Sequence, residues 1–434
     1  MIEFSYFIAC LFVIIVSCIK VLHVNSCAEW PELFVNGAEF TWRFTSDATN
    51  NEADSTSDDS FVAQILKRAP IFSKPYIPPL IWGRSGHLQT VIHSTFSRHK
   101  TPRVKGDSRH TLFLSDGSML TFDLFQPPTG AVSTEDVTLV VCPGIGNSSE
   151  TVALRAFSHH ANSYGYRVAV LNHLGIIPSI PLTTSRIFTY GSTEEYGAMV
   201  NKVKEMYPQS KLIAVGFSMG GNIVSKYLGE CSKQRANFVA GISCCQGYDI
   251  LKSLEIMGSW KHMGKAYLRA ICVCVQKVLH NFQSVLLSDE QLSRFGIQSR
   301  MELLYSLNLV HLDDILLSKM AGYSDYREYY RQSSSSLYIP QIDIPMLFIN
   351  AKDDPLIPPE MFDTPLRHTE VNKKAVFVVT KHGGHLGFYE CQEGSKFFQR
   401  GTFTWLDKAV VQYVGAVVFL ASAVRPQLRK QERK

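Results

Sequence analysis

The stretch of residues 211–226 constrains the fold of this chain more than any other part of its sequence. It opens with an apolar run (212–215) that has the length and composition of a buried strand. Gly216-Phe217-Ser218-Met219-Gly220 then matches the pattern G-x-S-x-G, and residues 222–228 are predicted to be helical. When a strand is followed by a serine between two glycines and then by a helix, the connection is a sharp turn. Such a turn exposes a nucleophilic serine at the edge of a sheet. Glycines are needed there because β-carbons would collide with neighbouring residues.

Strands and helices alternate along the chain on both sides of this turn. The expected strands are residues 137–142, 167–171, 238–244, 345–349 and 375–380, and the expected helices are residues 151–164 and 194–207. Such alternation predicts a mostly parallel sheet with helices on both faces. Earlier in the chain, Asp116-Gly117 separates two strand-like segments (111–114 and 118–125) and favours a β-hairpin.

The alternation stops between residues 247 and 342, where helical patterns, aromatic residues and polar turns prevail. An insertion at this point of an open sheet would lie over the carboxyl ends of the strands, where ligands bind in α/β folds. We therefore expect a helical lid. The alternative is a surface elaboration that has no role at the site.

Ser218 needs a histidine as its base and a carboxylate that orients this histidine. Two acids, Asp353 and Asp354, follow the strand expected at residues 345–349. Either carboxylate could receive the N–H of a histidine at this edge of the sheet. We prefer Asp354, because its position next to Pro355 lies further into the loop.

Two histidines, His382 and His385, follow the last expected strand within a glycine-rich loop. His385 is preferred as the base because the two glycines before it let the loop fold over the site. The order serine, aspartate, histidine along the chain is the order of α/β-hydrolases. His87 lies well before the core strands and is expected to be a packed structural histidine.

The loop at residues 143–149 is a candidate oxyanion loop, because it leaves an early strand and contains glycines that let backbone N–H groups approach a substrate. The backbone N–H groups of Ile145 and Met219 would then stabilise an oxyanion. An ordinary strand-to-helix loop or a phosphate-binding nest is the alternative, although the lysine and the spacing of nucleotide-binding loops are missing. Asn147 also begins an N-x-S glycosylation sequon.

An apolar segment near the N-terminus, residues 6–24, has about the length that crosses a bilayer as a helix. A retained signal anchor, a cleaved signal peptide and a buried helix are the alternatives. We favour the anchor, because the first residues carry an acid in place of a basic region and no small-residue cleavage site follows. Residues 44–60 are polar and acidic, which predicts a disordered linker between the anchor and the folded domain.

Composition narrows the range of partners. A net charge of +5 over 434 residues predicts no nucleic-acid partner. None of the 10 cysteines forms a C-x-x-C pair, so no metal is expected.

The expected organisation is an anchor at residues 1–25, a linker at 26–64, a catalytic domain at 65–425 and a basic tail at 426–434. The apolar run 409–424 is expected to be a packed or membrane-contacting helix.

Several blocks of the sequence are long enough to be specific. They are Trp82-Gly83-x-Ser85-Gly86-His87-Leu88-Gln89-Thr90, Ser115-Asp116-Gly117, Asn172-His173-Leu174-Gly175, Phe188-Thr189-Tyr190-Gly191, Gly216-Phe217-Ser218-Met219-Gly220-Gly221-Asn222, Tyr227-Leu228-Gly229-Glu230 and His382-Gly383-Gly384-His385-Leu386-Gly387-Phe388. Together they resemble the membrane-anchored α/β-hydrolase-domain lipases, a family that includes yeast ethyl-ester and acylglycerol hydrolases. The similarity covers about residues 65–410.

The resemblance implies an α/β-hydrolase fold and a serine hydrolase that cleaves the carboxylic esters of acylglycerols, with a lipid ester as substrate and no cofactor. It assigns Ser218 as the nucleophile, Asp354 as the acid and His385 as the base. It also implies a single-pass type II protein of the plasma membrane or endoplasmic reticulum, glycosylated at Asn147. Acyl transfer or thioester hydrolysis by the same triad, and a membrane steroid-binding protein with an idle triad, are the alternatives. The acidic stretch and the lid around residues 260–320 depart from the family pattern.

Overall fold

The computed structural model describes residues 29–40, 60–80, 82–95, 105–130, 135–259, 263–391 and 402–431. The segment expected to be a membrane anchor (residues 6–24) and almost all of the acidic stretch 44–60 lie outside this described part of the chain.

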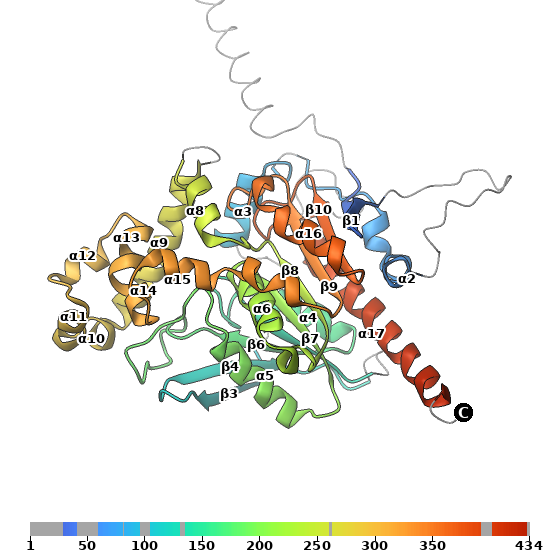
Figure 1. The fold of residues 1–434 in the computed structure, drawn as a ribbon, viewed down its shortest axis with the longest axis horizontal. Helices are drawn as coiled ribbons and strands as arrows, with labels where there is room; N and C mark the ends of the chain where they lie inside the picture. The colour runs from blue at the N-terminus through green and yellow to red at the C-terminus, as the bar shows by residue number, and fades with distance from the viewer. Residues whose placement is uncertain are drawn as a thin grey trace, which may run out of the picture.

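A ten-stranded sheet forms the centre of the described chain, with the strand order β2-β1-β10-β9-β8-β7-β5-β6-β4-β3 (Figure 1). Its six inner strands are parallel: β5 (Val137–Cys142), β6 (Arg167–Asn172), β7 (Lys211–Phe217), β8 (Phe238–Cys244), β9 (Met346–Ala351) and β10 (Ala375–Thr380). At one edge, β3 (Ser108–Phe113) and β4 (Met119–Phe125) form the expected antiparallel hairpin. The predicted parallel core is thus confirmed.

At the other edge, the sheet extends into the region expected to be a linker. β1 (Glu32–Val35) pairs antiparallel with β10, and β2 (Ala38–Glu39) pairs with β1. Leu33 is fully buried, so this short strand belongs to the core. Within the expected linker (residues 26–64), the described residues 32–35 and 38–39 therefore belong to the sheet. A strand of so few residues carries too little alternation to be recognised in the sequence.

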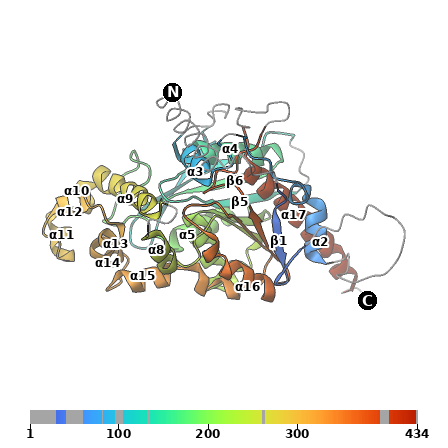
Figure 2. The same cartoon turned by 90° about the horizontal axis from the view of Figure 1, so that it is seen from above.

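Helices cover both faces of the sheet (Figures 1 and 2). One core contains Ile213 and Val215 of β7 and is covered by α2 (Phe61–Arg68), α4 (Val152–Ser163) and α17 (Trp405–Gln431). The other contains Leu212 and Ala214 of the same strand and is covered by α5 (Glu194–Met206), α6 (Met219–Glu230) and α16 (Asp363–Val371). Successive residues of β7 thus face opposite layers, as expected for a strand buried on both sides.

The C-terminal helix α17 packs against the sheet. Trp405 and Tyr413 are almost completely buried in the same core as α2 and α4. By length and composition, Trp405–Ala423 is the one described helix that could cross a membrane, and most of it lies inside the domain. Residues 409–424 were expected to form either a packed or a membrane-contacting helix, and in the structure they form a packed one. It continues to Gln431, so most of the expected basic tail is its last turns.

The segment between β8 and β9 is helical (Figure 1, α8 to α15), and its apolar side chains form a further core together with Ile187, Phe188 and Tyr190. Its helices are α8 (Ile250–Met257), α9 (Gly264–Asn281), α10 (Gln283–Leu286), α11 (Asp289–Phe295), α12 (Arg300–Leu304), α13 (Leu309–Leu312), the π-helix η3 (Asp313–Leu317), α14 (Ser318–Met320), α15 (Tyr326–Ser333), η4 (Ser335–Leu337) and η5 (Ile339–Gln341). The remaining short elements are η1 (Pro70–Ser73), α3 (Gly86–Thr95), α7 (Ser232–Arg235) and η6 (Pro359–Met361). Below, the segment from α8 to α15 is called the lid.

Candidate active site

Ser218 lies in the sharp turn between β7 and α6. Its backbone has φ 55° and ψ −120°, a conformation that is costly for a residue with a side chain. The flanking glycines permit it: a β-carbon on Gly216 would come within 2.3 Å of the Gly220 carbonyl oxygen. A β-carbon on Gly220 would come within 2.0 Å of the Cys142 carbonyl oxygen. The turn therefore holds the Ser218 hydroxyl at the carboxyl edge of the sheet, at the N-terminus of α6.

The structure brings Ser218, His385 and Asp354 together in one hydrogen-bonded chain. The Nε2 atom of His385 lies 2.7 Å from the Ser218 hydroxyl oxygen. The Nδ1 atom of His385 lies 2.8 Å from Oδ2 of Asp354, which is 2% exposed. This arrangement allows the imidazole to take a proton from the serine while the buried carboxylate stabilises the imidazolium.

The two neighbouring acids of this loop have different partners. Oδ1 of Asp354 accepts hydrogen bonds from the backbone N–H groups of Leu356 (2.8 Å) and Ile357 (3.0 Å). These bonds fix the carboxylate and leave Oδ2 for His385.

Asp353 accepts a hydrogen bond from the Gly384 N–H at 2.8 Å, and its Oδ2 lies 3.3 Å from Nδ1 of His382. Burial raises the pKa of the Asp353 carboxyl, and the contacts with His382 and Gly384 oppose this rise. Asp353 and His382 therefore form a separate pair that braces the histidine loop.

Ile145 and Met219, the residues expected to supply the oxyanion N–H groups, line the same cavity as Ser218. Met219 is the first residue of α6, where a backbone N–H has no acceptor within its own helix. Ile145 lies in the loop after β5, and a β-carbon on the adjacent Gly144 would stand 3.1 Å from the Ser218 β-carbon. Nε2 of His173 lies 3.0 Å from the Pro143 carbonyl oxygen and holds the start of this loop.

Asn147 belongs to the same loop. Its side-chain amide donates a hydrogen bond to the Ile145 carbonyl oxygen at 3.2 Å, and it lines the cavity beside Ser218. A glycan on this nitrogen would occupy the space above the serine. The placement argues against the glycosylation that the family resemblance implied.

Residues of α3 support the histidine loop, a role that the sequence did not reveal. The Thr90 hydroxyl accepts a hydrogen bond from the His385 backbone N–H at 2.8 Å. Gln89 accepts one from the Tyr389 N–H at 2.9 Å. Gly86 packs so closely that a β-carbon would lie 1.8 Å from the Asp353 carbonyl oxygen. The block around Trp82–Thr90 was a signal of this role, but the sequence alone did not show what it contacts.

His87, on the same helix, does not lie in the core. Its Nδ1 atom is 2.8 Å from the hydroxyl oxygen of Tyr267 on α9, and the two rings stack with centroids 5.7 Å apart. His87 is thus packed against Tyr267, in agreement with the expected structural role, and the contact joins α3 to the lid.

A cavity of about 560 Å³ opens over Ser218 and His385. Its wall is mostly apolar and includes lid residues such as Leu254, Leu268 and Ile271. The lid thus forms part of the site, as the position of the insertion predicted. A cavity of this size and lining suits an apolar ligand with a few polar groups.

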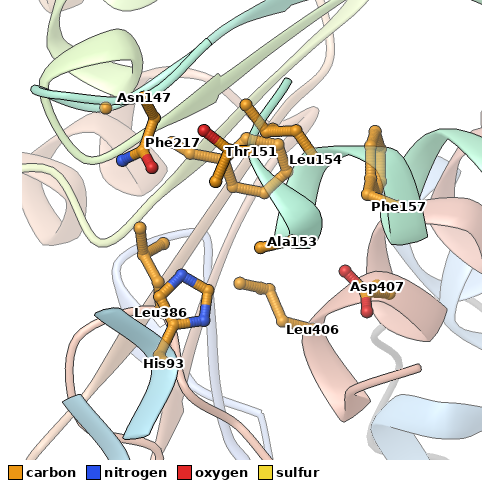
Figure 3. A pocket seen from close by; sticks show the side chains of 11 residues that line it. His93, Asn147, Thr151, Ala153, Leu154, Phe157, Phe217, Leu386, Leu406 and Asp407 are labelled. Atoms are coloured by element: carbon orange, nitrogen blue, oxygen red, sulfur yellow. The ribbon is translucent and has the colours of Figure 1, made fainter. Parts of the chain in front are cut away.

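A smaller hollow of about 30 Å³ adjoins the large cavity and shares Gly144, Asn147 and Leu386 with it. Figure 3 shows Phe157 of α4 and Leu406 of α17 among the side chains that line it. The hollow extends the apolar surface beside Ser218 between these two helices.

Cys245 follows β8 and lies behind the triad. Its sulfur and donor atoms of Asp354 and His385 lie within 4.8 Å of one another, which is close enough to hold a metal ion. Burial raises the pKa of the Cys245 thiol well above its usual value, and a protonated thiol is a poor metal ligand. In addition, Asp354 and His385 are already bonded to each other. These three side chains therefore fit a triad beside a neutral thiol better than they fit a metal site.

The chain is similar to several known proteins. A family model described as alpha/beta hydrolase fold matches residues 137–391. A Drosophila melanogaster protein named Abhydrolase domain-containing protein 2 is 41% identical over 364 residues, which cover 84% of this chain and 89% of that protein. A Mus musculus protein named Monoacylglycerol lipase ABHD2 is 41% identical over 355 residues, which cover 81% of this chain and 82% of that protein. The solved structure of the Pyrococcus furiosus esterase Pf2001 has a TM-score of 0.40 at 16% identity, over 66% of this chain and 91% of the esterase.

Proposed function

Because this chain belongs to the alpha/beta hydrolase family, we propose that it hydrolyses the ester bond of acylglycerols, with monoacylglycerol as the preferred substrate. The protein is a carboxylic ester hydrolase. The observation that carries the proposal is the hydrogen-bonded chain Ser218–His385–Asp354 at the wall of a large apolar cavity.

In the proposed reaction, the Ser218 oxygen attacks the ester carbonyl while His385 takes its proton. The N–H groups of Ile145 and Met219 stabilise the oxyanion of the tetrahedral intermediate. His385 then protonates the leaving alcohol, and an acyl group remains on Ser218. Water, deprotonated by His385, releases the fatty acid and restores the serine. Asp354 keeps the imidazole in the correct tautomer throughout.

The site supports a lipid substrate by its size and by its apolar lining, and the mouse relative is named for monoacylglycerol. We further propose that residues 6–24 anchor the protein as a single-pass type II membrane protein of the plasma membrane or endoplasmic reticulum, on the basis of their length and composition. An anchored enzyme would take its substrate from the bilayer.

The test is ester hydrolysis by the full chain in detergent micelles or vesicles that contain monoacylglycerol, with Ser218→Ala as the matched control. Release of fatty acid by the wild type and not by the variant supports the proposal. Transfer of the acyl group to added glycerol in place of water would indicate an acyltransferase. A folded wild-type protein that neither hydrolyses esters nor reacts with a fluorophosphonate probe would overturn the proposal and favour a binding protein.

A further inference from the structure

A buried carboxylate lies in the wall of the cavity and takes no part in the triad. Asp313 is completely shielded from solvent, yet it lines the same cavity as Ser218. Its Oδ1 accepts a hydrogen bond from the Tyr190 hydroxyl at 3.0 Å. Its Oδ2 accepts one from the Tyr330 hydroxyl at 2.5 Å. Both tyrosines also line the cavity, so the three side chains form one polar group in a mostly apolar wall.

The local backbone places this group on irregular but well-packed structure. Asp313 is the first residue of the π-helix η3, a rare geometry that occurs frequently at functional sites. The Tyr190 ring packs against Tyr329 and Tyr330 of α15, with centroids 5.7 and 6.2 Å away. The Tyr329 hydroxyl also accepts the Tyr190 backbone N–H at 3.1 Å. These contacts leave the hydroxyls of Tyr190 and Tyr330 little freedom to turn away from the carboxylate.

Asn222 connects the group to the nucleophile. It lies one turn after Ser218 on α6, and its amide donates hydrogen bonds to the carbonyl oxygens of Tyr190 (3.0 Å) and Ser333 (2.7 Å). Its carbonyl oxygen accepts the Ser335 N–H at 2.9 Å. The segment that carries Tyr190 and the end of α15 are thus both tied to the helix that begins at Ser218. The polar group is held in a fixed relation to the serine.

The hydrogen-bonding capacity of this group is only partly used. A carboxylate has about four acceptor positions, and the two tyrosines occupy two of them. Burial raises the pKa of Asp313 to about 7, against the opposing effect of the two tyrosine hydrogen bonds. The side chain can therefore accept a hydrogen bond when ionised and donate one when protonated. A hydroxyl group is the ligand that suits both states, because it both donates and accepts.

We propose that Asp313, Tyr190 and Tyr330 form a subsite that recognises a free hydroxyl on the alcohol part of the ester. The inference rests on the proposed function and deepens it, because it restricts the substrate class to esters of hydroxylated alcohols. A monoacylglycerol offers such hydroxyls. A fully acylated glycerol offers none, and it would cover the carboxylate with carbon and leave its remaining acceptor positions unpaired.

A graded series of esters of one fatty acid tests the subsite. The glycerol monoester has two free hydroxyls, the ethylene glycol monoester has one and the methyl ester has none. The wild type should show the highest kcat/KM for the glycerol ester. In Asp313→Asn and Tyr330→Phe, the ratio of kcat/KM between glycerol and methyl esters should fall about 10- to 100-fold, mainly through KM.

Tyr323→Phe is the matched control. Tyr323 belongs to the same tyrosine cluster, with its ring 5.7 Å from that of Tyr329, and the described donors to Asp313 are the hydroxyls of Tyr190 and Tyr330. This variant should keep the wild-type ratio. Thermal unfolding of every variant identifies a folding defect, and Tyr190→Phe replaces Asp313→Asn if the latter does not fold.

The outcomes separate this inference from the proposed function. A wild type without hydrolysis of any ester overturns the proposed function. A wild type that hydrolyses all three esters at similar rates overturns the subsite and leaves the esterase intact. The subsite is also overturned if folded Asp313 and Tyr330 variants lose activity on the three esters by the same factor, or keep the wild-type ratio.

Discussion

Asp353 and Asp354 are neighbours in the sequence, but their carboxylates face different histidines. Oδ2 of Asp354 lies 2.8 Å from Nδ1 of His385, whereas Oδ2 of Asp353 lies 3.3 Å from Nδ1 of His382. The loop after β9 therefore meets the loop after β10 through two parallel pairs. Since the His385 ring also contacts Ser218, Asp354 is positioned to act in the reaction and Asp353 to brace the loop.

Replacing the two acids one at a time should separate these roles. Asp354→Asn should lower kcat by about 10⁴, because the amide favours the wrong tautomer of His385. Asp353→Asn is the matched variant. It should lower the melting temperature, and it should lower kcat far less than Asp354→Asn does. Steady-state hydrolysis of a soluble chromogenic ester and thermal unfolding measure both effects. Equal losses of kcat in both variants would contradict the assignment.

Removal of the nucleophile or the base should abolish the chemistry and leave the fold intact. Ser218→Ala and His385→Ala should each lower kcat by about 10⁶, because the triad acts as a unit. Fluorophosphonate labelling followed by mass spectrometry should place the adduct on Ser218 in the wild type. An adduct at another residue would contradict the assignment.

Because Gly144 lies so close to the nucleophile, kcat should be sensitive to a substitution of this glycine. In Gly144→Ala the new methyl group would stand 3.1 Å from the β-carbon of Ser218, in a turn that cannot easily yield. We expect kcat to fall about 10- to 100-fold through misplacement of the serine and the oxyanion loop.

Gly197→Ala offers a control with the same distance. The methyl group would stand 3.1 Å from the Tyr227 ring, inside α5 and away from the cavity. It should leave kcat unchanged. A loss of rate in both variants, or in neither, would argue against a specific role of the loop after β5.

The buried carboxyl of Asp313 should make stability depend on pH. Burial raises its folded-state pKa from the usual 3.8 to about 7. The folded protein therefore binds a proton that the unfolded chain lacks between about pH 4 and about pH 7, and its stability falls as the pH rises through this range. Asp313→Asn should remove this component of the slope. Parallel melting-temperature profiles of variant and wild type would contradict the prediction.

Helix α17 should respond to substitution as a core helix. Val414 is fully buried, whereas Phe419 on the same helix is 54% exposed. Val414→Ser should cost about 2–4 kcal/mol of unfolding free energy, because it leaves a void and buries a hydroxyl. Phe419→Ser should cost much less. Denaturant unfolding measures both, and a greater loss at Phe419 would indicate that its exposed face has a partner.

Much of this architecture could be predicted because its signals are local. The strands before Ser218, Asp354 and His385 are continuous apolar runs, and each ends in the glycines or acids that the chemistry needs. Three distant residues could therefore be placed at one edge of a parallel sheet. The choice between neighbours in the sequence, such as His382 and His385, rested on loop glycines. The structure shows which of the two histidines contacts Ser218.

The rest depends on contacts that leave no local signal. The hydrogen bond from the His385 N–H to Thr90 joins residues 295 positions apart. Asp313 lies between two very short helices of the lid, α13 and α14, and a π-helix has no distinct sequence pattern. β1 is too short to show alternation, although Leu33 is part of the core. Such features follow from the tertiary packing of the whole domain.

If residues 6–24 anchor the protein as proposed, the bridge at Glu29 limits the distance between this domain and the bilayer. The first described contact of the chain is the bridge between Glu29 and Tyr76, and the Tyr76 hydroxyl in turn bonds Gln89 and Tyr389 beside the histidine loop. If residues 6–24 span the membrane, residues 25–28 are the whole tether, and they reach at most about 14 Å when extended. A connecting segment this short would keep the sheet edge that carries Ser218 close to the lipid headgroups. An ester could then pass from the membrane leaflet to the serine without crossing open water.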